Sequence, residues 1–149
     1  VVILFDRFNL PEDVYEIIFA TNQQKIVGKL LMSDMKENGG EMTKTQMSLF
    51  ATQLHEGNLI TEIDEPGYVG KKVKISYNKR QFYDRILTPM KSMGLIDYDL
   101  YKKTYKISDN FNKALIKIGL MWTRELRKDV KELNVKRKES SFITPLDDE

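Results

Sequence analysis

The sequence contains no cysteine and only one histidine in 149 residues. The lack of cysteine excludes disulfides, thiolate metal sites and cysteine nucleophiles, and it is compatible with an intracellular protein. No second histidine lies at a metal-ligand spacing from His55, so we interpret this residue as a helix-surface or core imidazole. We therefore expect a cytoplasmic protein with no metal site and no cofactor.

Long apolar runs are missing as well. With 31% charged residues and no apolar run near about 18 residues, we expect no membrane span. The opening VVILF is too short for a signal peptide and lacks a basic leader, and the missing initiator Met suggests that the chain starts inside a longer product. The 41% of hydrophobic residues suffice for a core, which suits one domain with helical extensions.

No catalytic pair and no phosphate-binding loop can be identified. The stretch GGEMTKT, residues 39–45, lacks the Gly-Lys-Ser/Thr ending of such a loop. The acids near the first predicted helix are interpreted as helix-start electrostatics, because none is paired with a base. These acids are Asp6, Glu12, Asp13 and Glu16. We predict that the chain is not an enzyme.

Charge is present in near balance, at +2 overall, but it is unevenly distributed. Residues 1–70 carry 5 basic against 11 acidic side chains, residues 71–138 carry 19 against 7, and residues 139–149 carry none against 4. Such separation creates a local positive field, for which a polyanion is the usual partner. A solvated basic helix face is the alternative interpretation.

Three helices are predicted before residue 58, in the stretches 10–22, 21–40 and 42–58. The second and third begin with possible capping boxes, Thr21 with Gln24 and Thr43 with Gln46. The period then changes to two over residues 59–76, which predicts a β-hairpin.

A fourth helix should start at Asn78 and end at Gly94, with Pro89 kinking it. Its predicted core face consists of Phe82, Ile86, Met90 and Met93. Residues 95–108 follow with strand, turn and strand character, which predicts a second hairpin.

A long helix is predicted from residue 109 to about residue 138, with a periodic apolar stripe. The stripe is Phe111, Leu115, Ile118, Trp122, Leu126, Val130 and Leu133. Monomers rarely expose so long a patch, so we expect Leu115, Ile118, Trp122, Leu126 and Val130 to form a homodimer interface. Folding of this helix back across its own domain is the alternative.

The acidic tail 139–149 has no period and is predicted to be mobile.

The order helix, helix, helix, hairpin resembles the winged helix-turn-helix family. The stretch RILTPMKSMGLIDYDLYKKTYKIS, residues 85–108, resembles its recognition-helix end and wing, and GEMTKTQMSLFATQL, residues 40–54, resembles the preceding helix. The terminal helices are similar to the dimerisation extensions of MarR-like regulators. This resemblance implies an α+β, mainly helical fold with an inserted hairpin, where the family usually has a short turn. It divides the chain into an N-terminal extension (1–23), a winged-helix domain (24–108), a dimerisation helix (109–138) and the tail (139–149).

Candidate DNA-binding residues lie on the outer face of the fourth helix. Arg80 and Arg85 suit guanine edges or phosphate, and Gln81 suits adenine. We also expect Tyr77 on this face, in contact with phosphate or sugar. A solvated helix face is the alternative.

Two further groups are candidates for phosphate contacts. One is the predicted wing tip, Tyr101, Lys102 and Lys103, where an exposed, charge-solubilised turn is the alternative. The other is the start of the third helix, Thr43, Lys44 and Thr45, where simple capping explains Thr43 equally well.

Two functions follow from these residues. The leading hypothesis is sequence-specific binding of double-stranded DNA by a homodimeric transcription regulator. The alternative is a winged-helix protein-interaction module whose basic face meets an acidic partner.

Overall fold

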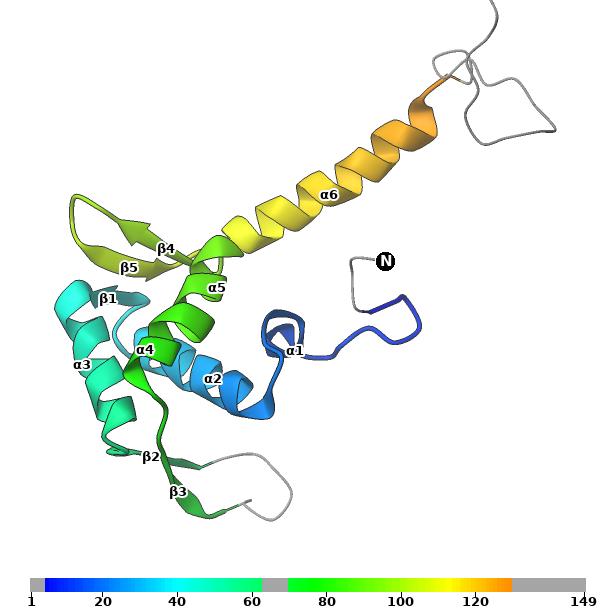
Figure 1. Ribbon diagram of the computed structural model, residues 1–149. Helices are drawn as coiled ribbons and strands as arrows, with labels where there is room; N and C mark the ends of the chain where they lie inside the picture. Colours follow the sequence, from blue (N-terminus) through cyan, green and yellow to red (C-terminus); the bar gives the residue numbers. More distant parts are fainter. Residues whose placement is uncertain (1–4, 63–69, 130–149) are drawn as a thin grey trace, which may run out of the picture. The chain divides into compact units, whose positions relative to one another are not determined.

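The computed structural model describes residues 5–62 and 70–129, and the chain divides into two compact units, residues 1–114 and 115–149. The first unit is α+β, with helices, a three-stranded antiparallel sheet and a separate two-stranded hairpin (Figure 1). The predicted α+β class is therefore confirmed. Val130, the remainder of the helix predicted to residue 138 and the tail 139–149 lie outside the described residues.

The first three helices are α1 (Val14–Ile18), α2 (Asn22–Glu37) and α3 (Lys44–His55). Both predicted capping boxes are present: the Thr21 hydroxyl accepts from the Gln24 N–H, and the Thr43 hydroxyl accepts from the Gln46 N–H. Each box satisfies N–H groups that a helix start otherwise leaves without partners. After α3, Gly57 adopts a φ of 72° and turns the chain out of the helix.

The fourth helical stretch consists of α4 (Lys79–Phe82), the π-helical turn η1 (Tyr83–Leu87) and α5 (Thr88–Ser92). Pro89 lies at the start of α5, directly after the π turn. Proline has no N–H and its ring crowds the carbonyl four residues earlier, so a widened turn relieves the conflict. Pro89 was predicted to kink the helix, and the structure has a π turn before the proline.

Both predicted hairpins are confirmed. In the inserted hairpin, β2 (Leu59–Glu62) pairs antiparallel with β3 (Lys72–Ile75). In the second, β4 (Ile96–Asp99) pairs with β5 (Thr104–Ile107). A further strand, β1 (Glu41–Thr43), was not predicted, and it pairs with β5 to give the order β1-β5-β4.

The core of the first unit lies between the helices and the sheet. Phe82, Ile86 and Met90 are fully buried, as predicted, and α2 contacts η1 across this core. The fully buried side chains also include Val27, Leu31, Met35, Met42, Met47, Leu54 and Ile96. No buried side-chain nitrogen or oxygen among the described residues lacks a hydrogen-bond partner.

Two predictions about this helical stretch are wrong. Tyr77 is only 6% exposed, because it lies before the N-cap Asn78, outside the helix, and packs in the core. Met93 is exposed instead of buried. Met93 is the C-cap of α5, so the helical spacing that predicted its burial ends there, and Leu87 in the π turn is buried in addition.

Helix α6 (Asn110–Arg127) begins in the first unit and forms the described start of the second. The Phe111 N–H donates to the carbonyl of Gly94, 3.0 Å away, and a Cβ at Gly94 would lie 2.7 Å from that nitrogen. Gly94 also has a φ of 86°, so glycine is required here on both counts. No described helix is both long and apolar enough to cross a membrane.

Candidate nucleic-acid interface

The helical stretch from α4 to α5 presents a polar face to solvent. Arg80, Gln81 and Arg85 are exposed there, as predicted, while Phe82 and Ile86 anchor the opposite face in the core. Asp84 lies on the exposed face too, with its Oδ2 3.9 Å from Nε of Arg80. An exposed ion pair of that length is weak, so the Arg80 guanidinium stays accessible to another anion.

The start of this stretch is fixed by hydrogen bonds to three neighbours. The Asn78 side chain accepts from the N–H of Gln81 at 3.1 Å, and Nδ1 of His55 accepts from the N–H of Lys79 at 3.1 Å. The N–H of buried Tyr77 donates to the carbonyl of Leu54. The end of α3 thus sets where α4 begins, and Tyr77 serves as an anchor instead of a ligand contact.

Lys79 joins α4 to the outer side of α3. Its Nζ donates to the Thr52 hydroxyl at 2.9 Å and to the Ser48 hydroxyl at 3.4 Å. Ser48 and Thr52 line a shallow open hollow with Lys44 and Thr45. Sequence reasoning missed Lys79, because its partners lie 27 and 31 residues away and no local pattern links them.

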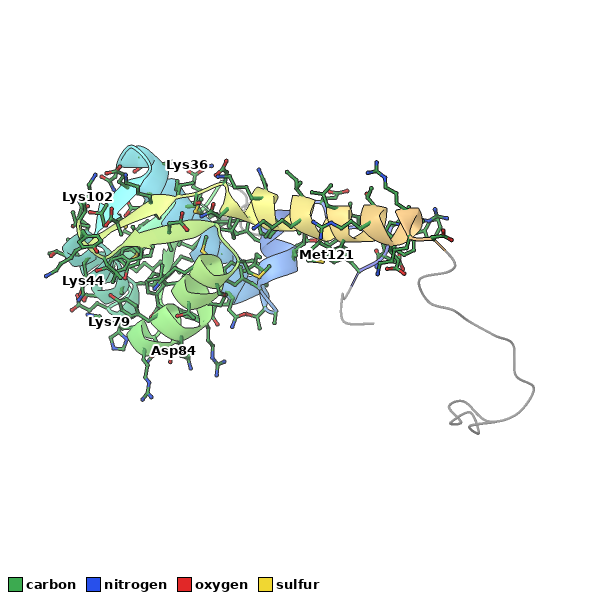
Figure 2. The ribbon with its side chains drawn as sticks, turned by 90° about the horizontal axis from the view of Figure 1, so that it is seen from above. Lys36, Lys44, Lys79, Asp84, Lys102 and Met121 are labelled. Carbon is green, nitrogen blue, oxygen red and sulfur yellow. The ribbon has the colours of Figure 1, made fainter. Side chains whose placement is uncertain are left out.

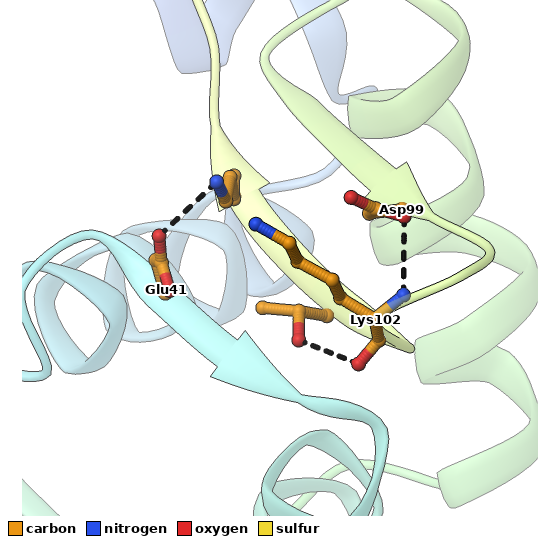
Figure 3. Close-up of polar contacts among 5 residues, drawn as sticks. Glu41, Asp99 and Lys102 are labelled. Carbon is orange, nitrogen blue, oxygen red and sulfur yellow. Dashed lines mark hydrogen bonds and ion pairs between the residues drawn. The ribbon is translucent and has the colours of Figure 1, made fainter.

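The predicted wing tip is a structured turn. Oδ1 of Asp99 accepts from the N–H of Tyr101 at 2.9 Å. It also accepts from the N–H of Lys102 at 3.1 Å, and the Thr104 hydroxyl donates to the Lys102 carbonyl (Figure 3). The backbone hydrogen bonds from Lys102 and Tyr101 lower the pKa of Asp99. Although its backbone is held, the tip is open to solvent: Tyr101 is 98% exposed. Lys102 and Lys103 are also exposed.

Strand β1 brings the wing tip and the start of α3 together. Thr43 stands opposite Thr104 in the register, and the Lys44 N–H donates to the Lys103 carbonyl at 2.9 Å. An ion pair of 3.3 Å between Glu41 and Lys106 supports the same pairing (Figure 3). Two groups predicted separately from the sequence therefore form one surface.

Figure 2 shows Lys44, Lys79 and Lys102 along one edge of the first unit, with Asp84 further along the same edge. The backbone bond from Lys44 and the hydrogen bonds from Lys79 to two hydroxyls connect these positions through α3. The Thr43 hydroxyl is engaged as the cap of α3, so the capping interpretation of this residue is correct. Lys44 and Thr45 are exposed beside it. The surface is basic, polar and open, which suits an extended anion better than an enclosed small molecule.

The described residues hold no group of three or more histidine, aspartate or glutamate side chains placed for a metal ion. Another hollow lies between α1, α2 and β2, and its wall contains the 2.9 Å ion pair of Lys29 with Asp13. Partial burial raises the pKa of Asp13, but hydrogen bonds from Lys29 and the Tyr15 N–H outweigh it and leave the pKa below its ordinary value of 3.8.

The described part of α6 carries an exposed apolar face. Leu115, Ile118, Trp122 and Leu126 recur there at intervals of three and four residues. Each is roughly half exposed or more, with Trp122 at 63% and Leu126 at 67%. Val130, the fifth residue of the predicted interface, lies outside the described residues.

Comparisons of this chain with family models, with curated proteins and with solved structures found no match.

Proposed function

We propose that the chain is a winged helix-turn-helix protein that binds double-stranded DNA sequence-specifically and regulates transcription. The support comes from the order of elements: α2, β1, α3, the stretch α4 to α5, then β4 and β5, with β1 paired to β5. In a winged helix of this order, the stretch α4 to α5 acts as the recognition helix and the turn between β4 and β5 as the wing tip. The inserted hairpin β2–β3 is an addition to that plan.

The observation that carries the proposal is the exposed face of the recognition helix. Arg80, Gln81 and Arg85 are side chains that pair with base edges in the major groove, and they project from a helix whose other face is fixed in the core. Their helix is held at its start by His55 and Asn78, so little ordering is needed on binding.

Phosphate contacts are supplied by the edge beside that face. Lys102 and Lys103 at the wing tip and Lys44 and Thr45 at the start of α3 lie within one hydrogen-bonded assembly. Cations at such positions neutralise backbone phosphates and add affinity without reading sequence. In this proposal the recognition helix provides sequence specificity, and the edge provides affinity for the phosphate backbone.

The proposal includes a homodimer that forms through α6 and is located in the cytoplasm. The exposed stripe of Leu115, Ile118, Trp122 and Leu126 is an apolar patch of a kind that monomers rarely present. A second copy of the same helix covers such a stripe in a two-fold interface, as in the MarR-like regulators that the sequence resembles. Two recognition helices then meet two half-sites of one operator.

The experiment that tests the proposal is selection of duplexes from a random pool, followed by titration of the selected and unselected duplexes at several salt concentrations. We expect one enriched sequence, tighter binding to it, and affinity that falls steeply with salt. Binding without enrichment contradicts the sequence-specific function. No binding to any duplex contradicts DNA binding altogether and favours a module that meets an acidic protein.

A further inference from the structure

The base of the inserted hairpin β2–β3 is held by packing and by a hydrogen bond next to the start of the recognition helix. Leu59 and Ile75, paired at its base, pack against the core of the first unit. The Tyr77 N–H donates to the Leu54 carbonyl, which closes the hairpin onto the end of α3. Only residues 76–78 separate β3 from α4. The position of the hairpin is thus coupled to that of the recognition helix.

The two faces of the hairpin differ in exposure. Because side chains alternate along a strand, Val73 and Ile75 lie on the half-buried face with Leu59, while Lys72 and Lys74 lie on the exposed one. Lys74 stands opposite Ile60 in the register, and Lys72 stands opposite Glu62. Lys74 therefore has an apolar cross-strand neighbour that does not offset its charge.

Basic residues continue along the sequence from β3 into the recognition helix. From Lys71 to Tyr83 the chain contains five basic residues and no acidic one. The five are Lys71, Lys72, Lys74, Lys79 and Arg80. The continuity indicates the same polyanionic partner for both.

The two hairpins lie at opposite ends of α3 (Figure 1). The wing tip contacts the start of α3 through Lys44 and Lys103, and the inserted hairpin leaves from its end, where Tyr77 binds Leu54. With 12 residues, α3 is about 18 Å long. This separation exceeds the roughly 12 Å width of the major groove, so the two hairpins can reach the sugar-phosphate backbones on its two sides.

We propose that the exposed lysines of β3, chiefly Lys72 and Lys74, contact the DNA backbone on the side of the major groove opposite the wing. The inserted hairpin is then a second phosphate-binding arm, and the recognition helix lies between the two arms. This inference rests on the proposed DNA binding and deepens it, because it assigns a partner to a hairpin that the winged-helix plan does not require.

The test compares two double variants that each remove two exposed lysines. The arm variant, Lys72→Ala with Lys74→Ala, removes the two proposed phosphate contacts of β3. The control, Lys36→Ala with Lys117→Ala, changes the net charge by the same amount at exposed positions on α2 and α6. We expect the arm variant to bind all duplexes more weakly and to lower the slope of log K against log salt by up to about 1.8, at about 0.9 for each phosphate that is no longer neutralised. Lys72 stands opposite Glu62, so Lys74 should account for the larger part of this change. The control should keep the slope of the unchanged chain, and both variants should melt as it does because all four side chains are exposed.

Hydroxyl-radical footprinting of the same variants locates the arm on the duplex. Within a half-site, the arm variant should lose backbone protection at one end, and a Lys102→Ala with Lys103→Ala variant should lose it at the other. Equal slopes and footprints for the arm variant and the unchanged chain overturn the inference while leaving DNA binding intact. An equal loss in the Lys36 and Lys117 control also overturns it, by assigning the effect to net charge. If the unchanged chain binds no duplex, the proposed function fails first.

Discussion

The imidazole Nδ1 of His55, at the end of α3, accepts a hydrogen bond of 3.1 Å from the backbone N–H of Lys79, in the first turn of α4. The two residues are 24 positions apart, and the whole inserted hairpin lies between them. The N–H of Lys79 lies in the first turn of α4, where it has no carbonyl partner within the helix, and His55 supplies the acceptor.

We predict that His55→Ala lowers stability by up to about 1 kcal/mol, because it removes one exposed hydrogen bond at the helix start. The orientation of Arg80 should loosen with it, so affinity for the selected duplex should fall more than affinity for random duplex. Thermal unfolding and anisotropy titration measure the two effects. His55→Asn, which keeps an acceptor, is the matched variant, and identical behaviour of the Ala and Asn variants would show that the bond has no role.

For the recognition face, Arg80→Ala or Arg85→Ala should cost about 1–3 kcal/mol on the selected duplex and less on random DNA, because each change removes a bidentate pairing with a base. Tyr77→Phe is the control: this residue is buried, so its phenolic oxygen should not contribute to DNA affinity. Titrations against both duplexes measure the difference. Equal losses on the two duplexes would reassign the arginines to the phosphate backbone.

At the wing, Lys102→Ala with Lys103→Ala should weaken binding to every sequence alike and lower the salt slope by up to about 1.8. Leu100→Ala, at the same exposed tip, should leave the slope unchanged because it carries no charge. Titration over a series of salt concentrations provides the measurement. If the lysine variant keeps the original slope, the wing tip does not bind phosphate.

On α6, Trp122→Glu with Leu126→Glu should convert a dimer into a folded monomer, because charge on the apolar stripe opposes its burial. The control, Lys117→Glu with Arg124→Glu, changes the opposite side of the same helix and should remain dimeric. Light scattering gives the mass and circular dichroism checks the fold. If the protein without substitutions is monomeric at tens of micromolar, the proposed binding to two half-sites is contradicted.

The pH dependence of stability should reveal the ion pair of Asp13 with Lys29. The pKa of Asp13 is lower in the folded chain than its ordinary value of 3.8, so its contribution to stability is present above 3.8 and is lost as pH falls through the folded pKa. Asp13→Asn should therefore melt earlier than the unchanged chain at neutral pH, and this difference should shrink on acidification. Lys29→Met should behave in the same way. A difference that stays constant with pH would mean that the ion pair contributes nothing.

Features that depend on neighbours in the sequence were predictable. The capping boxes at Thr21 and Thr43 join residues three apart, and each hairpin follows a two-residue period between turn residues. Strand β1 was not predictable in this way. Three residues carry too little periodicity, and β1 forms a strand because its partner, β5, lies about 60 residues further along.

The errors at Tyr77 and Met93 have one origin in the assumption of a regular helix. A wheel of 100° per residue holds only inside an α-helix, and Tyr77 lies before the N-cap of α4 while Met93 is the C-cap of α5. Pro89 marked an irregularity in the sequence, but the shift in phase that accompanies a π turn became visible only through the burial of Leu87. In the candidate site, the exposure of Arg80, Gln81 and Arg85 could be predicted from their residue types and their face of the helix. The contacts of Lys79 could not, because they depend on tertiary structure.

The pairing of Leu59 with Ile75 means that the chain leaves α3 and returns to α4 at nearly the same place. A segment whose two ends meet can vary in length at little cost to the framework that holds it, since loop closure depends only weakly on length. The part of the insertion beyond the Leu59–Ile75 pair can therefore change in length or sequence while this pair keeps its packing against the core, and a different hairpin tip on the same base would give the same framework a different reach.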